Sequence, residues 1–216
     1  MALSQHFLHR IKQLYGVTEL GSITVLSLAT IATAWCGYQS ALWGGIQTFA
    51  LHETDRSERA AAQQEVQVNQ LRMVDAALFV QYLTARTRGE EQVAELLRQR
   101  FRPEAQVATS AWLATDPDVN PDAPSSPFVM PQYRLAAAKR AEELRAEASD
   151  HQITARKANT NSDNYVMLTV LFTTVLFFTG ICTKLPSQTM RRATLGIGVL
   201  LFVVGLVVLV QFPVAD

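Results

Sequence analysis

The sequence has little of what a disulfide-stabilised or nucleic-acid-binding domain requires. It holds two cysteines in 216 residues, Cys36 and Cys182. Both lie in apolar stretches at different predicted depths, so we expect no disulfide between them. The 19 basic residues are balanced by 19 acidic ones. The chain therefore lacks the positive surplus of a nucleic-acid-binding protein, and we expect no nucleic-acid partner.

Motifs that carry catalysis are also missing from the sequence. It contains no phosphate-binding glycine loop, no HExxH or CxxC pair and no GxSxG turn. Its four histidines are scattered along the chain. We therefore predict that the protein is not an enzyme, that it has no catalytic residues and that it uses no cofactor.

What the sequence does contain is three apolar runs without a charged residue, at 21–45, 165–183 and 194–212. Each is long enough to cross a hydrocarbon core of roughly 30 Å as a helix. Strand-like alternation is nearly absent elsewhere. These observations predict an all-α membrane protein with three transmembrane helices.

The basic residues near these runs predict their orientation. They lie in the segments 1–20 and 184–193, which we expect to be cytoplasmic because short basic loops stay inside. The large segment 46–164 and the tail 213–216 then lie on the periplasmic side of a bacterial inner membrane. The basic residues concerned are Arg10, Lys12, Lys184, Arg191 and Arg192.

The segment 46–164 is predicted to be a long antiparallel helical hairpin, similar to a coiled coil but without clean heptads. No proline or glycine occurs from Ile46 to Arg88, so the first transmembrane helix can continue outward for ~40 residues, or roughly 60 Å. Two short helices follow, the second opening at Pro103, and five prolines mark a tip loop at 115–131. From Gln132 a helix returns to the second span.

Apolar and small residues recur along both arms of this hairpin at helical spacing. On the outgoing arm one series includes Leu71, Val74 and Leu78. A second series on the outgoing arm consists of Val66, Met73, Ala77 and Val80. On the returning arm, the alanines expected to pack against the outgoing arm are Ala137, Ala141 and Ala148.

The first span carries an unusual strip of small residues at spacings of three and four. Such a strip allows close approach of another helix. Three alternatives remain open: the strip packs against the second span of the same chain, it forms a seam between subunits, or its hydroxyls line a pore. The strip consists of Thr24, Ser27, Thr30, Ala34, Gly37, Ala41 and Gly44.

The outer half of the same span holds three aromatic residues, Trp35, Tyr38 and Trp43. Amphipathic aromatic rings are typical of the membrane–water interface, so we assign them to an interfacial aromatic belt. The small residues of "ATA" before Trp35 also fit a signal-peptide cleavage site. We favour an uncleaved span, because a bulky tryptophan would begin the mature chain and the helical periodicity continues past it.

One group of residues could bind a metal ion. If the arms pair antiparallel, His52, Glu53 and Asp55 lie near Asp163, and a histidine with three carboxylates suits a divalent cation. The alternative is a polar belt at the level of the lipid headgroups, where such side chains are expected in any case.

The stretches "ATAWCGYQ", "RFRPE", "AWLATDP", "NPDAP" and "SDNYVMLTVLF" resemble a group of three-span bacterial membrane proteins with a long helical segment. The similarity covers most of the chain. It implies placement in a bacterial inner membrane and no particular activity.

Together these features predict a non-enzymatic, oligomeric inner-membrane protein that presents its periplasmic hairpin as a scaffold or partner-binding element. The expected partners are the lipid bilayer, further copies of the chain, and a periplasmic or membrane protein. The alternative is an oligomeric channel lined by the first span. A sensor is disfavoured because the predicted cytoplasmic portions leave no room for an output domain.

Overall fold

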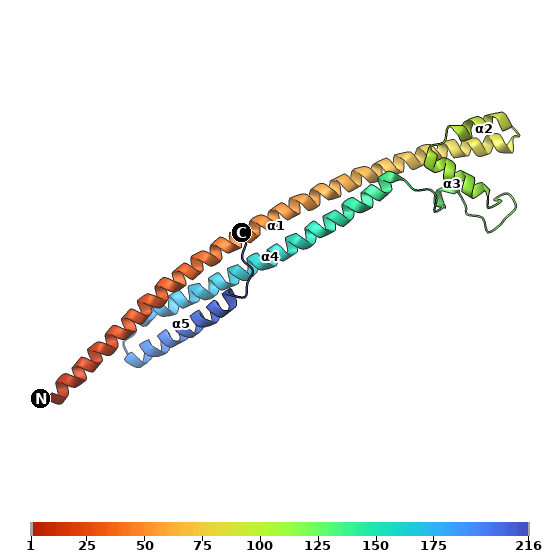
Figure 1. Cartoon of the computed structure of the whole chain (residues 1–216). Coiled ribbons are helices and arrows are strands. Elements are labelled where there is room, and N and C mark those ends of the chain that lie inside the picture. The colour runs from red at the N-terminus through yellow and green to blue at the C-terminus, as the bar shows by residue number, and fades with distance from the viewer. Residues whose placement is uncertain (1, 216) are drawn as a thin grey trace. The chain divides into compact units, whose positions relative to one another are not determined.

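The structure is a computed structural model that describes the backbone of residues 2–215 and the side chains of residues 19–215. It is 82% helical, with no strand in the described range, and so confirms the predicted all-α class. The basic side chains predicted to orient the first span lie before residue 19, outside the described side chains. Figure 1 shows α1 (Ala2–Thr87), α2 (Glu91–Gln99), α3 (Pro103–Leu113), the short 3-10 helix η1 (Pro127–Val129), α4 (Ala136–Cys182) and α5 (Gln188–Leu209).

Three of these helices, α1, α4 and α5, are long and apolar enough to cross a membrane. This agrees with the three apolar runs of the sequence. The unbroken length of α1 agrees with the absence of proline from the whole helix and of glycine from residues 46–88. The helix ends just before Gly89, whose φ of +73° is a left-handed conformation that glycine adopts without steric cost. The returning helix α4 begins at Ala136, four residues later than predicted, because residues 131–132 form a turn and residues 133–135 have no regular secondary structure.

The chain divides into two compact units. The first, Met1–Leu51 with Gln152–Asp216, contains the apolar parts of α1 and α4 together with α5; we call it the three-helix unit. The second, His52–His151, contains the remainder of α1 and α4 with α2 and α3; we call it the four-helix unit.

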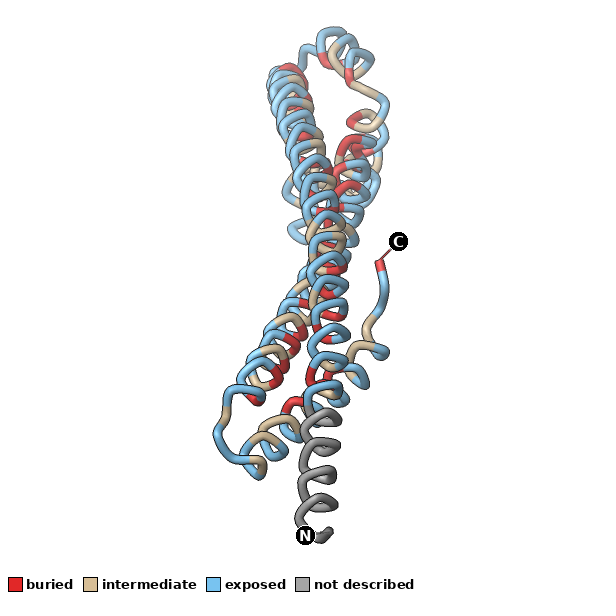
Figure 2. The backbone as a smooth tube through the Cα atoms, turned by 90° about the vertical axis from the view of Figure 1, so that its left-hand side faces the viewer, coloured by how far each residue is buried: buried red, intermediate tan, exposed pale blue. Residues whose placement is uncertain are grey.

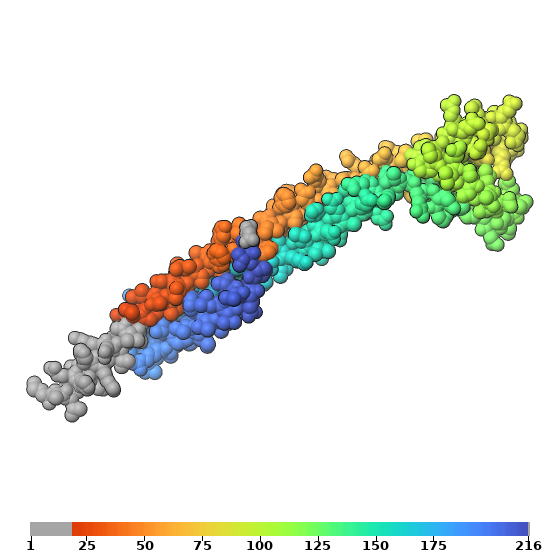
Figure 3. Space-filling model, in the orientation of Figure 1, coloured from red at the N-terminus to blue at the C-terminus, as the bar shows by residue number. Residues whose placement is uncertain are grey.

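The core of the three-helix unit is built from small residues of α1 and large residues of α4. Figure 2 shows buried positions along the facing sides of its helices, and Figure 3 shows α4 and α5 packed alongside α1. Small side chains on one helix leave room for bulky ones on its neighbour, which gives dense packing. The buried residues are Ala29, Ala32 and Cys36 of α1, Tyr165, Leu168, Phe172 and Val175 of α4, and Phe202 of α5.

Two glycines bring α5 close to α4. A Cβ atom added at Gly205 would lie 2.8 Å from Cε1 of the fully buried Phe172, and one added at Gly198 would lie 3.0 Å from Oγ1 of Thr179. At Gly196, on the same helix, an added Cβ would meet nothing within 4 Å. The first two glycines are therefore needed for the close approach, and the third is not.

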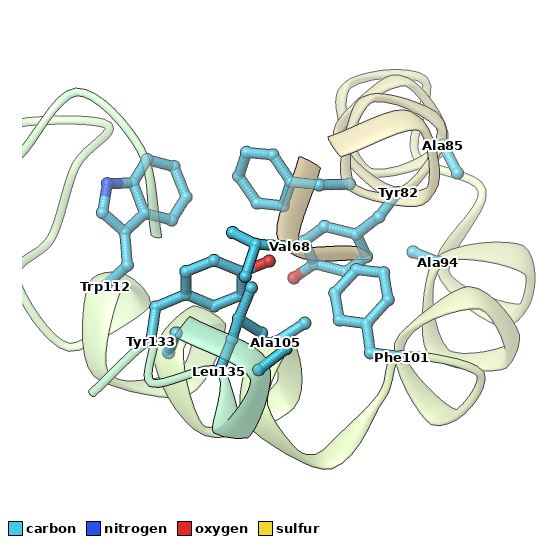
Figure 4. Packing of buried hydrophobic residues seen from close by; sticks show 12 residues of the cluster. Val68, Tyr82, Ala85, Ala94, Phe101, Ala105, Trp112, Tyr133 and Leu135 are labelled. Carbon is cyan, nitrogen blue, oxygen red and sulfur yellow. The ribbon is translucent and has the colours of Figure 1, made fainter. Parts of the chain in front are cut away.

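The four-helix unit has a separate core rich in aromatic rings, shown in Figure 4. The ring of Phe79 on α1 packs edge-on against Trp112 of α3 at 5.4 Å and against Phe128 of η1 at 5.5 Å between centroids. Edge-to-face pairs at this distance are favourable beyond the area that they bury. Tyr82 makes a similar contact with Phe101, at 5.7 Å. The short helices and the proline-rich loop are thus fixed to α1 by aromatic packing.

Within this unit, two polar contacts join α1 to residues at and just before α4. Glu65 of α1 forms an ion pair with Arg145 of α4, and further along α1 Asp75 accepts a hydrogen bond from Tyr133 just before α4. The alanines that the sequence assigned to helix pairing, Ala137, Ala141 and Ala148, are all buried.

Candidate functional site

The small-residue strip of the first span does not face its own neighbouring helices. Six of its seven residues are exposed, and Gly44 is half-buried. A Cβ atom added at Gly37 or Gly44 would meet nothing within 4 Å. We therefore set aside the alternative in which this strip packs against the second span. The exposed residues are Thr24, Ser27, Thr30, Ala34, Gly37 and Ala41.

A different face of α1 makes the intramolecular contact. Ala29, Ala32, Cys36 and Gln39 follow a spacing of three, four and three, and all are buried. One residue step turns an α-helix by about 100°, so this face and the strip lie on separate sides of the same helix. Apart from Gln39, both faces consist of small residues, but only the buried face is matched to the large side chains of α4.

The hydroxyl groups of the strip are bonded to their own helix. Thr24, Ser27 and Thr30 donate to the carbonyl oxygens of the residues four positions earlier, at 2.9, 2.9 and 2.8 Å. This satisfies the hydroxyl protons, whereas the oxygen lone pairs stay available as acceptors. The strip presents oxygen acceptors and no donors from these groups.

The aromatic residues of the predicted belt fall into two environments. Trp35 and Tyr38 are exposed, with ring centroids 5.9 Å apart, as expected for side chains at a lipid interface. Trp43 is half-buried, and its indole Nε1 donates to the carbonyl oxygen of Pro213 at 3.1 Å. Trp43 therefore holds a second segment of the chain in addition to any interfacial role.

That contact belongs to a polar cluster that we call the Gln39 clasp, formed by Gln39, Trp43, Tyr165 and the segment Pro213–Ala215. Gln39 is fully buried. Its Oε1 accepts from the backbone N–H of Ala215 at 2.8 Å, and its Nε2 donates to the carbonyl oxygen of Ala215 at 3.3 Å. The hydroxyl of Tyr165 donates to the carbonyl oxygen of Pro213 at 3.1 Å.

The clasp recognises main-chain atoms and no side chain of the bound segment. Proline has no N–H, so Pro213 adds no donor that would need a partner. A buried primary amide without hydrogen bonds would cost roughly 2–7 kcal/mol in an apolar setting, and the backbone of Ala215 satisfies both ends of Gln39. The clasp therefore ties the segment that follows α5 to α1 and α4.

Sequence reasoning missed the clasp. It placed Trp43 in the aromatic belt and had no partner for Gln39. The available signal was the glutamine itself, because an amide within an apolar helix has to find hydrogen-bond partners. The identity of those partners, 176 residues away, was not accessible from spacing.

The predicted metal ligands gain no support from the described side chains. No group of three or more His, Cys, Asp or Glu is placed to hold a metal ion within that range. His52 and Asp55 are exposed, and Glu53 forms an ion pair with Arg56 at 3.6 Å. Asp163, which belongs to the other unit, accepts a hydrogen bond from Asn159 at 2.9 Å.

A buried charge lies in the four-helix unit, which sequence reasoning did not single out. The side chain of Asp75 is fully buried, and its Oδ2 accepts from the hydroxyl of Tyr133 at 2.7 Å. Nε of Arg102 lies 3.3 Å from Oδ1, without the geometry of a hydrogen bond. The attraction between these two groups is therefore coulombic. Burial, and then the hydrogen bond to Asp75, raises the pKa of the Tyr133 phenol.

Between residues 60 and 84, the outward face of α1 in this unit has no charge. Every residue of the face is exposed, with 56% exposure at Val66, 73% at Met73 and 60% at Val80. The residues 60–84 include only three charges, Glu65, Arg72 and Asp75. Glu65 and Asp75 bind groups of their own unit, and Arg72 lines a groove against α4. We call this the Met73 face, formed by Gln63, Val66, Gln70, Met73, Ala77, Val80 and Thr84.

The chain matches no known protein family, curated protein or solved structure.

Proposed function

We propose that the protein is a non-enzymatic, oligomeric membrane protein of the bacterial inner membrane, which presents the four-helix unit in the periplasm as a scaffold or partner-binding element. The Met73 face carries this proposal. The core of the unit is complete without that face, since its aromatic cluster lies between α1, α3 and η1. A row of exposed apolar side chains that its own unit does not use is typical of a contact surface.

The three-helix unit would supply the anchor. Its helices are long and apolar enough to hold the chain in a bilayer, with the lipid contacting the many exposed apolar residues of these helices. The resemblance to three-span bacterial proteins supports the inner membrane as the location. The basic residues Arg191 and Arg192 at the start of α5 support a cytoplasmic position for the loop before it.

The placement of the four-helix unit is tested by cysteine labelling in a background in which Cys36 and Cys182 are replaced by alanine. We expect a membrane-impermeant maleimide to label Ser125→Cys in intact spheroplasts, because Ser125 is exposed in the tip loop. The matched control Ser187→Cys, exposed in the loop before α5, should label only in inside-out vesicles. The reverse pattern would refute the periplasmic placement.

A second candidate function is an oligomeric channel lined by α1. It is favoured by the exposed hydroxyls of Thr24, Ser27 and Thr30, which would present oxygen acceptors along a path if several copies met around an axis. Acceptor oxygens suit a cation.

Conductance in planar bilayers separates the two functions. The scaffold proposal expects no current from a reconstituted protein whose oligomeric state has been verified. A current that changes in Thr30→Leu or Gly37→Leu would establish the channel and overturn the scaffold as the main function. Gly196→Leu, on α5, provides the control because that position is exposed and open.

A further inference from the structure

We infer that the Met73 face binds the same face of a second copy of the chain, so that two α1 helices associate in parallel through residues 60–84. This inference rests on the proposed function and names the partner. The surface is a helix face with Val66, Met73 and Val80 exposed at intervals of seven residues and Gln63, Gln70, Ala77 and Thr84 between them. Spacings of three and four that repeat every seven residues are the pattern by which helices pair.

The charge distribution favours self-association. When a helix face binds the same face of a second copy in register, each residue contacts the identical residue of the other copy. A charged residue on the face would therefore be repelled by the same charge on the other copy. The Met73 face avoids this repulsion because none of its members is charged.

The other long helix of the same unit provides an internal comparison. The exposed side of α4 carries Lys139, Arg140, Glu143 and Glu147, and both Lys139 and Arg140 form ion pairs with Glu143. That arrangement is typical of a solvated face. Two helices of one unit thus expose surfaces of opposite character, and only the surface on α1 suits a like partner.

Anchoring in a bilayer sets the direction of the pairing. Copies inserted in one membrane with the same topology are related by rotation about the membrane normal, so their α1 helices run parallel and in register. Val66, Met73 and Val80 then form three apolar layers. Gln63 and Gln70 meet their own copies, and each amide can donate to and accept from the other. A buried polar layer of this kind fixes the register of a coiled coil.

The expected affinity is modest. The residues 60–84 span about three and a half heptads, near the shortest length that indicates a coiled coil. One of the two core positions in each heptad is mostly polar. Confinement to a membrane raises the effective concentration of the copies, which compensates for a weak interface. We therefore expect the pairing in membranes and its loss on dilution in detergent.

The test is disulfide cross-linking in native membranes, in the background with Cys36 and Cys182 replaced by alanine. Met73→Cys should give a dimer on mild oxidation, because symmetry places the two thiols opposite each other. The control is Ser149→Cys, exposed on α4 in the same unit, which should stay monomeric. In a second design, Val66→Cys serves as the cross-linking reporter. Adding Met73→Glu to this variant should reduce the yield of cross-linked dimer about tenfold, because it brings like charges together in the interface.

The cross-linking and labelling results together distinguish self-association through the Met73 face from the periplasmic placement. Equal dimer formation at Met73→Cys and Ser149→Cys indicates random collision and overturns the inference. Cross-linking only to a different protein, or none, overturns it as well, and the scaffold function then stands if Ser125→Cys still labels from the periplasm. Failure of that labelling with intact Met73→Cys dimers would instead refute the periplasmic placement and leave self-association in force.

Discussion

Replacing Tyr133 by phenylalanine removes one oxygen atom from the core of the four-helix unit and should destabilise that unit selectively. The phenol is the donor to Oδ2 of Asp75, at 2.7 Å. The other carboxylate oxygen, Oδ1, has no hydrogen-bond partner among the described residues, although Nε of Arg102 lies 3.3 Å from it. Tyr133→Phe therefore leaves a fully buried carboxylate with a coulombic neighbour and no hydrogen bond.

The magnitude follows from this geometry. A hydrogen bond to a charged group contributes about 1.5–3 kcal/mol net, and leaving a buried acceptor unsatisfied costs a similar amount. Because Asp75 loses its only hydrogen bond from a described residue, we expect a value in the upper part of this range, about 2–3 kcal/mol. This corresponds to roughly 30-fold to 150-fold in the opening equilibrium of the unit.

Hydrogen exchange read by mass spectrometry on the full chain in detergent would measure this change region by region. Peptides from residues 68–85 and 128–145 should exchange faster by the factor given above, whereas peptides from α5 should not change. Tyr82→Phe is the matched control, since it deletes the same group from a buried ring whose hydroxyl has no hydrogen bond among the described residues. Equal acceleration in the two variants would refute the argument.

Alkaline pH provides an independent readout of the same contact. The pKa of Tyr133 is raised in the folded unit, so the unfolded chain releases this proton at lower pH than the folded chain does. The stabilisation from this group is complete below the ordinary tyrosine pKa of about 10 and declines as the pH rises above it. Opening of the four-helix unit should increase above that pH in the native chain and less steeply in Tyr133→Phe.

Two further predictions concern the three-helix unit. Gln39→Leu removes the side chain that holds Ala215 at both backbone atoms, so a cysteine at the buried position 215 (Ala215→Cys) should react with maleimide at least about tenfold faster than in the native background, given a loss of two hydrogen bonds. Gly205→Ala places a methyl group 2.8 Å from the buried ring of Phe172 and should lower the thermal unfolding midpoint, with a cost of about 1–3 kcal/mol. Gly196→Ala should leave the midpoint unchanged, because that position is open.

The architecture could be predicted from the sequence where single-residue rules decide it. The absence of helix-breaking residues from Ile46 to Arg88 predicted the long α1, and Gly89 and Pro103 predicted the ends of the elements around them. Three uncharged runs predicted the three apolar helices. In each case the position of a helix depends on the backbone preferences or the hydrophobicity of the residues within that segment.

The choice between faces of α1 could not be made in the same way. Two sets of small residues run along this helix, and both permit close approach. Which set is buried depends on the shape of the α4 surface, with Tyr165 and Phe172 placed against Ala29, Ala32 and Cys36. Spacing along one helix contains no information about the shape of its neighbour.

The buried polar contacts could not be predicted from the sequence for a related reason. A single aspartate such as Asp75, within a stretch of mixed apolar and polar residues, looks like a solvated residue. Its partner Tyr133 is 58 residues away, and the partner of Gln39 is 176 residues away. Contacts of that sequence separation depend on the complete fold, so a sequence can only indicate that a buried polar group needs a partner.

The Gln39 clasp also sets an order for assembly. Gln39 lies in α1, which is synthesised before α5, and the atoms that satisfy it belong to a residue that follows α5. Until α5 has folded against its neighbours, α1 holds an amide within an apolar helix that lacks these partners, at a cost of roughly 2–7 kcal/mol. In an incomplete or wrongly inserted chain, the side-chain amide of Gln39 therefore lacks the hydrogen bonds that it makes to Ala215 in the folded chain.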